Sequence, residues 1–308
     1  MSQGHRSFQA VSCDVVTCDV VTLMNFSKTI LITGTSSGFG LLTAARLASH
    51  GHQVVATMRN LDKKNPLLAE VHKRGGTVDL FQLDVTDKKS IQAAVQAIVA
   101  KYHHVDVLVN NAGYGIGGFF EDLTDEEIRQ QMEVNFFGVQ NVTRAVVPFM
   151  RERRSGKIIN TSSVAGFSTS PAFGAYNASK WALEAFSESL RYELSPWGIQ
   201  VLLIEPGTYK TKIFHENARY AKKFDDPSSP YYSHSQFLKK KVLDFVDHCR
   251  KDPEKVAALV EKLIHSPHPA FRNIPDIESR MLFMLRKTLP FRLYSRFINT
   301  ALFADFKD

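Results

Sequence analysis

The sequence has little cysteine and no long hydrophobic run, and both absences narrow the class of protein. Only three cysteines, Cys13, Cys18 and Cys249, occur among 308 residues, too few for the disulfide framework of a small secreted domain. No stretch approaches the roughly 18 consecutive apolar residues that a membrane-spanning helix needs. The N-terminus lacks the basic start, apolar middle and small-residue cleavage site of a secretory signal. With 44% hydrophobic and 22% charged residues, disorder and fibrous architectures are excluded. We therefore expect a soluble cytoplasmic protein.

Acidic residues are also in the minority, because the net charge is +7. The surplus is local: residues 219–241 and residues 280–308 each hold six basic residues against two acidic ones. Both patches are interleaved with aromatic residues. A solvated face, an anionic ligand and an anionic membrane surface each account for such patches. We expect a small-molecule substrate and no nucleic-acid partner.

The first two dozen residues differ from the rest of the chain. Cys13-Asp14-Val15-Val16-Thr17 is repeated at once as Cys18-Asp19-Val20-Val21-Thr22, a duplication that a packed domain rarely needs. We predict that residues 1–24 are a poorly ordered extension, and Met24 is a candidate start of translation. The two cysteines have no second Cys or His pair nearby, so no metal site is expected.

From Lys28 onwards short β-branched runs alternate with long amphipathic stretches. The runs, which predict strands, are 29–32, 53–56, 78–83, 105–109, 157–159 and 199–204. The stretches, which predict helices, are 38–49, 65–73, 88–102, 125–150 and 172–194. Apolar strands separated by helices indicate an α/β fold, a doubly wound parallel sheet of about seven strands with helices on both faces. Ligands of such sheets bind beyond the carboxyl ends of the strands. We expect a catalytic domain over 25–275 with a lid at about 208–250, and an amphipathic tail over 276–308.

A glycine-rich turn follows the first predicted strand and opens into a helix. Its spacing is Gly-x-x-x-Gly-x-Gly, and the residues placed to bind a pyrophosphate are Gly34, Ser36, Ser37, Gly38, Phe39 and Gly40. Glycines let the backbone turn tightly and approach a phosphate at the positive end of the helix. Glycines also end strands for structural reasons alone. It is the position of this turn between a predicted strand and a predicted helix that indicates nucleotide binding.

The next three strand ends carry further candidates for cofactor contacts. The second ends in Thr57-Met58-Arg59, without the acid that commonly binds the adenosine ribose of NAD, and Arg59 can pair with a 2′-phosphate. NADP(H) is therefore preferred over NAD(H), unless Arg59 is an ordinary surface residue. Asp84, followed by Val85, either accepts from an adenine amino group or caps the next helix. After the fourth strand, the small segment Asn111-Ala112-Gly113 offers amides and a floor beneath a cofactor.

Three polar residues near the fifth strand form the most specific pattern. Ser163 follows that strand, and Tyr176 and Lys180 lie four residues apart on the next predicted helix, which places them on one helical face. Half-ionisation of a tyrosine near neutrality requires lowering its pKa by about 3 units, or roughly 4 kcal/mol. One cation about 4 Å away supplies about that much at an effective dielectric near 20. Ser162 is the alternative to Ser163.

In order and spacing, these motifs resemble the short-chain dehydrogenase/reductase family over roughly residues 28–210, with flanking patterns to about 275. The glycine turn matches the family's glycine motif, and Asn110-Asn111-Ala112-Gly113 matches its strand-four motif. Ser163 stands 13 residues before Tyr176, the family's usual separation, and Tyr176-Asn177-Ala178-Ser179-Lys180 fits its active-site motif. Further matches are Asn135, at the fourth catalytic position, Pro206 and Gly207, in the turn that passes the nicotinamide, and Thr208 and Thr211, which follow that turn.

The resemblance implies a role for each catalytic residue. Tyr176 exchanges the proton of an alcohol–carbonyl pair, and Lys180 lowers the pKa of Tyr176 and binds the nicotinamide ribose. Ser163 holds the substrate oxygen, and Asn135 positions a water that relays protons to Lys180. The expected activity is an NADP-dependent alcohol–carbonyl oxidoreductase. An idle NAD(P)-binding sensor or scaffold on the same fold, and an adaptor at a membrane surface, are the alternatives.

The last third of the chain bears on the substrate. Eight aromatic residues lie in the segment 208–250; they either surround a bulky apolar substrate, such as a steroid, retinoid or long-chain ketone, or pack the helices of the lid. This layout resembles the retinol and 17β-hydroxysteroid dehydrogenase branch. The tail reads as an amphipathic helix broken near Pro290. It packs on its own domain, forms a homo-oligomer contact, or lies on a membrane surface.

Overall fold

A computed structural model describes residues 27–210 and 219–306 of the chain. The expected extension at 1–24 and the candidate Thr211 lie outside these residues. Among the described residues, no helix is both long and apolar enough to cross a membrane.

The centre of the fold is a seven-stranded parallel sheet, as the sequence predicts. The strand order is β3-β2-β1-β4-β6-β7-β9, built from β1 (Thr29–Thr33), β2 (Gln53–Met58), β3 (Val78–Gln82), β4 (Val107–Asn110), β6 (Gly156–Thr161), β7 (Ile199–Ile204) and β9 (Arg272–Asn273). From β1 the chain crosses to β2 and β3 on one side, and β4 then pairs with the other side of β1. The order of the sheet therefore reverses between β1 and β4, where a parallel sheet binds its ligand.

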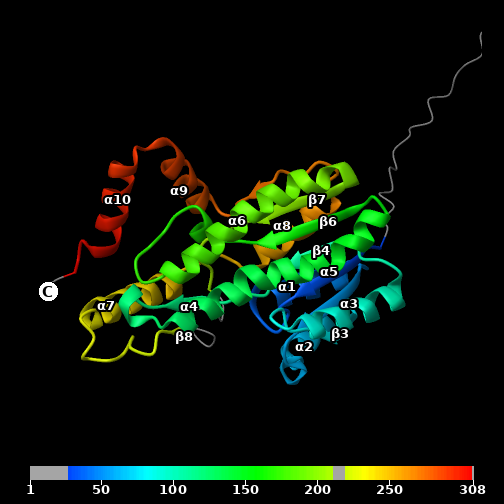
Figure 1. The fold of residues 1–308 in the computed structure, drawn as a ribbon, viewed down its shortest axis with the longest axis horizontal. Helices are drawn as coiled ribbons and strands as arrows, with labels where there is room; N and C mark the ends of the chain where they lie inside the picture. Colours follow the sequence, from blue (N-terminus) through cyan, green and yellow to red (C-terminus); the bar gives the residue numbers. More distant parts are fainter. Residues whose placement is uncertain (1–26, 211–218, 307–308) are drawn as a thin grey trace, which may run out of the picture.

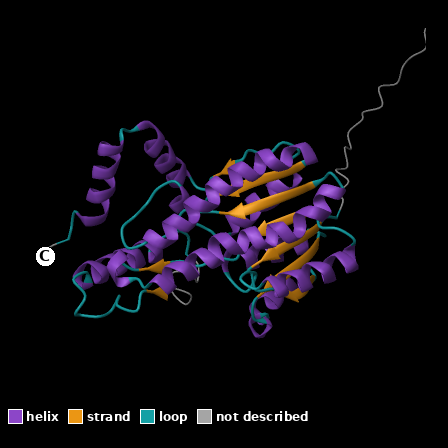
Figure 2. Cartoon of the chain, viewed as in Figure 1, coloured by secondary structure: helices purple, strands orange, loops and turns teal. Residues whose placement is uncertain are grey.

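Helices cover both faces of this sheet (Figure 1, Figure 2). One core joins the sheet to α1 (Gly38–Ser49), α2 (Asn65–Lys73) and α8 (Glu254–His265). The other joins it to α3 (Lys88–Tyr102), α5 (Gly138–Glu152) and α6 (Gly174–Leu194). Successive residues of each central strand enter opposite cores, as Ile30 and Leu31 do, which explains why the strands read as unbroken apolar runs.

The helix predicted over 125–150 is divided into three parts. It consists of α4 (Asp125–Met132), a π-helical turn (Glu133–Phe137) and α5. Such turns are frequently found at functional sites, and this one contains Asn135. The apolar periodicity continues through the turn, which is why the sequence pattern did not reveal it.

The remaining elements gather at one end of the sheet. They are the two-stranded sheet of β5 (Ile116–Gly117) and β8 (Arg219–Tyr220), followed by α7 (Tyr232–Asp247), α9 (Ile277–Thr288) and α10 (Phe291–Phe303). The predicted break near Pro290 is confirmed, since α9 ends before it and α10 begins after it. Figure 2 shows the arrowheads of the central strands pointing toward this end of the molecule.

Candidate active site

The residues that the sequence singled out follow the strands at this same carboxyl edge. Across the sheet, Asp84 lies after β3, Arg59 after β2, the glycine turn after β1, and residues 111–113 after β4. Ser163 and Pro206 follow β6 and β7. A single extended ligand lying across this edge could contact all of these segments.

The glycine turn is tightly packed against the segment that follows β4. Gly34 has φ +71°, and a Cβ on it would lie 2.7 Å from the Cα of Ala112. A side chain on Gly40 would collide with the amide of Asn111 and the carbonyl of Gly34. Asn111 Nδ2 donates to the carbonyls of Thr33 and Gly34, each at 3.0 Å. Asn111 therefore braces the turn, while α1 begins at Gly38 with no acid in its first turn, leaving its positive end suited to an anion.

At the other end of this edge, Arg59 and Asp84 are placed differently. Arg59 is exposed, and the structure gives its guanidinium no ion pair with any residue in 27–210 or 219–306. Asp87, not Asp84, caps α3 by accepting from the backbone of Lys89. Asp84 instead accepts from the backbone and hydroxyl of Thr86 through Oδ1, and Val85 packs against Gly138. The helix-capping alternative for Asp84 is therefore wrong.

Ser163, Tyr176 and Lys180 come together where β6, its following loop and α6 meet. The side chains of Ser163 and Tyr176 form a hydrogen bond, and Lys180 Nζ lies 5.8 Å from the centre of the Tyr176 ring. Ser162 is directed to Glu184 instead, so it is Ser163 that faces the tyrosine.

The protonation of this group differs from the sequence expectation. Lys180 Nζ donates to the carbonyl of Thr161 at 2.8 Å, and burial lowers the pKa of Lys180 to about 8. Burial raises the pKa of Tyr176, and the hydrogen bond with Ser163 opposes this effect. Lys180 was expected to lower the pKa of Tyr176. The Lys180 ammonium is directed to Thr161 instead, and desolvation is the main influence on the pKa of the phenol.

Asn135 is fixed beside this group by the π-helical turn. Its Nδ2 donates to the Tyr114 carbonyl at 2.9 Å and to Ser179 Oγ at 3.1 Å, and its Oδ1 accepts from the Tyr114 amide at 3.1 Å. Ser179 Oγ in turn donates to the carbonyl of Tyr176. A Cβ on Gly113 would lie 3.1 Å from Asn135 Oδ1 and 3.9 Å from Lys180 Nζ. The four predicted catalytic side chains thus belong to one connected region.

The turn after β7 is held by residues that the sequence did not single out. The Pro206 carbonyl accepts from Ser163 Oγ at 3.4 Å and from the Val164 amide at 3.0 Å. Gly207 donates its amide to Asp276 Oδ2 at 3.3 Å, while Thr208 accepts from the Cys249 thiol. Asp276 also caps α9 and pairs with Lys251 at 3.0 Å. These contacts join residues 25 to 69 positions apart in the chain, so no local spacing could have revealed them.

The Tyr176 ring packs against a glycine, and aromatic residues lie on the segment that follows Ser163 and on α9 and α10. Gly115 packs against the Tyr176 ring, since a Cβ there would lie 3.5 Å from a ring carbon. Phe167 meets Phe283 of α9 at 5.0 Å between ring centres, and Tyr294 of α10 hydrogen-bonds Ser168. The rings of the expected lid pack on neighbours: Tyr209 against Phe39, Tyr220 against Phe224, Tyr231 against Phe119, and Phe237 against Phe303 and Phe306. Of the two uses expected for the aromatic residues of 208–250, packing of the lid is therefore observed for these four, and contact with a substrate stays a prediction.

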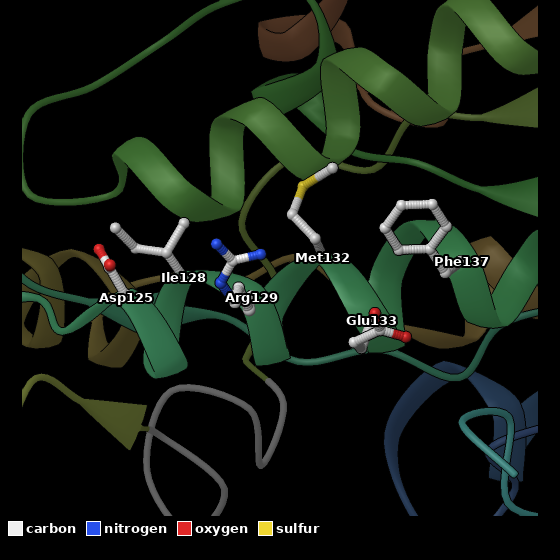
Figure 3. A pocket seen from close by; sticks show the side chains of 6 residues that line it. All are labelled: Asp125, Ile128, Arg129, Met132, Glu133 and Phe137. Carbon is white, nitrogen blue, oxygen red and sulfur yellow. The ribbon is translucent and has the colours of Figure 1, made fainter.

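A separate surface hollow lies on the outer side of α4. It is lined by Asp125, Ile128, Arg129, Met132, Glu133 and Phe137 (Figure 3). Asn135 and Gln131, on the same segment, are buried and do not line this hollow. The hollow therefore contains none of the four candidate catalytic residues.

The fold, the glycine turn and the Ser-Tyr-Lys group define a class of dinucleotide-dependent oxidoreductase. A family model described as short chain dehydrogenase matches residues 28–221. The chain belongs to the short-chain dehydrogenase/reductase family. It is therefore an oxidoreductase that interconverts an alcohol and a carbonyl with NAD(P).

Relatives and solved structures support the assignment over most of the chain. The chain is 39% identical over 244 residues to a 3-ketodihydrosphingosine reductase of Bacteroides thetaiotaomicron, covering 79% of this chain and 86% of that protein. It is 35% identical over 269 residues to human retinol dehydrogenase 8, covering 84% and 85%. A short-chain dehydrogenase from Streptomyces avermitilis superposes with a TM-score of 0.75 at 32% identity, covering 90% and 96%.

Proposed function

We propose that this chain is an NADP(H)-preferring oxidoreductase acting on a secondary alcohol–carbonyl pair of a bulky apolar molecule. The observation that carries the reaction is the placement of Ser163, Tyr176 and Lys180 beside the turn that Pro206 and Gly207 form. In this proposal residues 25–275 form the catalytic domain, with a lid at about 208–250 and a tail from 276 onwards.

The residues at the carboxyl edge of the sheet suit a dinucleotide. The close approach at Gly34 and Gly40 leaves bare backbone facing the start of α1, where a pyrophosphate is favoured. Ser36, Ser37, Gly38 and Phe39 complete that cradle. Asp84 and Val85 would hold the adenine, residues 111–113 the middle of the ligand, and Pro206, Gly207 and Thr208 the nicotinamide. When bound, the cofactor supplies or accepts the hydride.

The chain's own groups control the proton and the position of the substrate. Tyr176 would donate its phenolic proton to a carbonyl oxygen during reduction, or accept the proton of an alcohol during oxidation. Ser163, already hydrogen-bonded to Tyr176, would hold the same oxygen. Lys180 would bind the nicotinamide ribose, and Asn135 would order a water next to Lys180.

The cofactor preference rests on Arg59. Its guanidinium is exposed at the end of β2 without an ion pair in the described part of the chain, and Met58-Arg59-Asn60 offers no carboxylate to repel a 2′-phosphate. We expect tighter binding of NADPH than NADH in fluorescence titrations, and loss of most of the difference in Arg59→Ala. The matched control is Lys63→Ala, which removes a nearby exposed cation. Equal affinities for NADPH and NADH in the unmodified protein would overturn the preference.

The substrate class rests on aromatic residues of the segments next to the candidate site and on the relatives. The names of two relatives refer to apolar molecules, 3-ketodihydrosphingosine and retinol. Phe167, Phe283 and Tyr294 lie on segments that flank the candidate site. A panel of steroid, retinoid and long-chain carbonyl compounds, screened by loss of NADPH absorbance, tests this class. Turnover of short polar carbonyls alone would contradict it.

We further propose that α9 and α10 lie on an anionic lipid surface. Six large apolar side chains on these helices are between 47% and 73% exposed: Ile277, Met281, Met284, Phe291, Leu293 and Phe297. Residues 277–306 contain five basic residues and two acidic ones, a charge that complements anionic headgroups. The opposite side of the helices packs on the domain through Phe283 and Tyr294.

Vesicle flotation tests the tail. We expect flotation with phosphatidylserine-containing vesicles, little with phosphatidylcholine alone, and loss in Phe291→Ser/Phe297→Ser. Phe120→Ser, which removes an exposed ring outside the tail, is the control and should float normally. Failure of the unmodified protein to float, together with a homo-oligomer that the same double substitution dissociates, would assign the tail to self-association instead.

A further inference from the structure

Two glutamates are buried beside each other behind the candidate active site. Glu184 of α6 is 4% exposed and Glu205, just after β7, is 0% exposed. One guanidinium nitrogen of Arg272, in β9, lies 2.6 Å from Glu184 Oε2 and 2.5 Å from Glu205 Oε1. The Ser162 hydroxyl also faces Glu184. Arg272 donates a hydrogen bond to Glu205 Oε1, whereas both oxygens of Glu184 and Oε2 of Glu205 have no hydrogen-bond donor among the described residues.

Arg272 is the only cation in the described part of the chain that pairs with these two buried carboxylates, and Lys180 acts on Glu184 alone, without an ion pair. A second negative charge in such a site is more costly than retaining a proton. A proton on one acid also lets it donate to the other, so that the two titrate as a pair. Burial raises the pKa of both acids, and that of Glu205 to about 8. Because Lys180 and the Ser162 hydroxyl favour the charged form of Glu184 and not that of Glu205, the proton resides mainly on Glu205, and Glu184 carries the charge.

The two glutamates adjoin two parts of the candidate site, namely α6, which carries Lys180, and the turn that follows β7. Glu184 lies one helical turn after Lys180 on α6, and its charge opposes the effect of burial on the pKa of Lys180. Glu205 stands between Ile204, whose carbonyl accepts from the Ser162 amide at 2.8 Å, and Pro206, whose carbonyl accepts from Val164 and Ser163. The charged groups that face the pair are Lys180 from α6 and Arg272 from β9.

We propose that Glu184 and Glu205 share one proton beside Arg272 and act as positioning residues that keep Lys180 charged and Ser163 in place. The kinetic part of this inference rests on the proposed function. The shared proton itself does not, because it is measurable in the folded protein without turnover.

The two amide substitutions move the negative charge in opposite directions. In Glu205→Gln the charge stays on Glu184, next to Lys180. In Glu184→Gln the remaining acid, Glu205, ionises against Arg272, and the charge moves away from Lys180. We expect Glu184→Gln to move the alkaline limb of the kcat/KM profile to lower pH by about half a unit or more. In Glu205→Gln the limb should stay or move to higher pH. Glu188→Gln, an exposed position one turn further along α6, is the control.

Unfolding measured against pH tests the shared proton without activity. The folded pair keeps a proton that the unfolded chain releases above about 4.5, the ordinary glutamate pKa. The free energy of unfolding should therefore fall as the pH rises from about 4.5 to about 8. In either single variant the remaining acid pairs alone with Arg272, and this fall should be smaller. Glu188→Gln should retain it.

The results separate the two proposals. If unfolding shows the shared proton but no carbonyl compound is reduced, the proposed function fails and the shared proton stands. Equal pH slopes of unfolding in the unmodified protein and both variants, or equal shifts of the alkaline limb, would overturn the inference. Should either variant fail to fold, infrared difference spectra of the unmodified protein between pH 6 and pH 9 give the answer. Loss of a buried protonated-carboxyl band with rising pH is expected, and its absence refutes the shared proton.

Discussion

Replacement of Asn111 with alanine should loosen the glycine turn before it affects any chemistry. The side-chain amide donates to the carbonyls of Thr33 and Gly34, each at 3.0 Å. A net value of about 0.5–1.5 kcal/mol for each bond gives a loss of about 1–3 kcal/mol in the free energy of unfolding. The turn is expected to bind the cofactor's pyrophosphate, so part of that cost is also incurred when NADPH binds. Since 1.4 kcal/mol corresponds to a tenfold change, we expect the Kd for NADPH to rise about fivefold or more.

Urea unfolding and fluorescence titration of NADPH measure the two effects separately. Asn65→Ala, at an exposed position at the start of α2, is the matched control and should leave both quantities nearly unchanged. An Asn111→Ala protein with unchanged stability and a Kd within a factor of two would show that the turn holds its shape without Asn111.

Three further predictions concern the packing and the pH dependence. Lys157→Met should lower the free energy of unfolding by about 1.5–3 kcal/mol in urea titrations. The reason is that Lys157 Nζ donates to the carbonyls of Leu263, Ile264 and Ser266 at the end of α8. An unchanged free energy of unfolding would mean that water replaces the ammonium. Gly40→Ala should weaken NADPH binding more than Gly174→Ala, since a Cβ meets Asn111 and Gly34 at the first position and nothing within 4 Å at the second; equal Kd values would contradict this. Finally, kcat/KM should fall as the pH rises above about 8. Burial lowers the pKa of Lys180 to about 8, so its positive charge is lost above that pH. A kcat/KM that stays constant up to pH 10 would show that the reaction does not depend on the charge of Lys180.

Most of the fold could be predicted from the sequence, because its strands and helices produce local patterns of apolar residues. Each central strand is an apolar run that the two cores bury on both sides, and each run was found within two residues of its observed bounds. The break at Pro290 follows from the fixed φ of proline and its missing amide. The approximate ends of the strands then sufficed to place the residues after them at one edge of the sheet.

Contacts between residues far apart in the chain could not be predicted, because they leave no local pattern in the sequence. The π-helical turn around Asn135 leaves the apolar periodicity intact, although it sets where that side chain points. The contacts of Asp276 with Gly207 and Lys251, and those of Arg272 with Glu184 and Glu205, join segments far apart in the chain. A spacing between Tyr176 and Lys180 indicates a shared helical face, but the bond from Lys180 to Thr161 and the burial of the phenol depend on packing around them.

The most direct test of the central claim is Tyr176→Phe, assayed with NADPH and a carbonyl substrate from the panel that the unmodified protein reduces. The substitution removes only the phenolic oxygen, which lies in a hydrogen bond with Ser163, and leaves the ring against Gly115. Turnover should be abolished, while the Kd for NADPH and the melting temperature should stay close to those of the unmodified protein. Turnover at the unmodified rate would contradict the assignment of Tyr176 as the group that exchanges the proton.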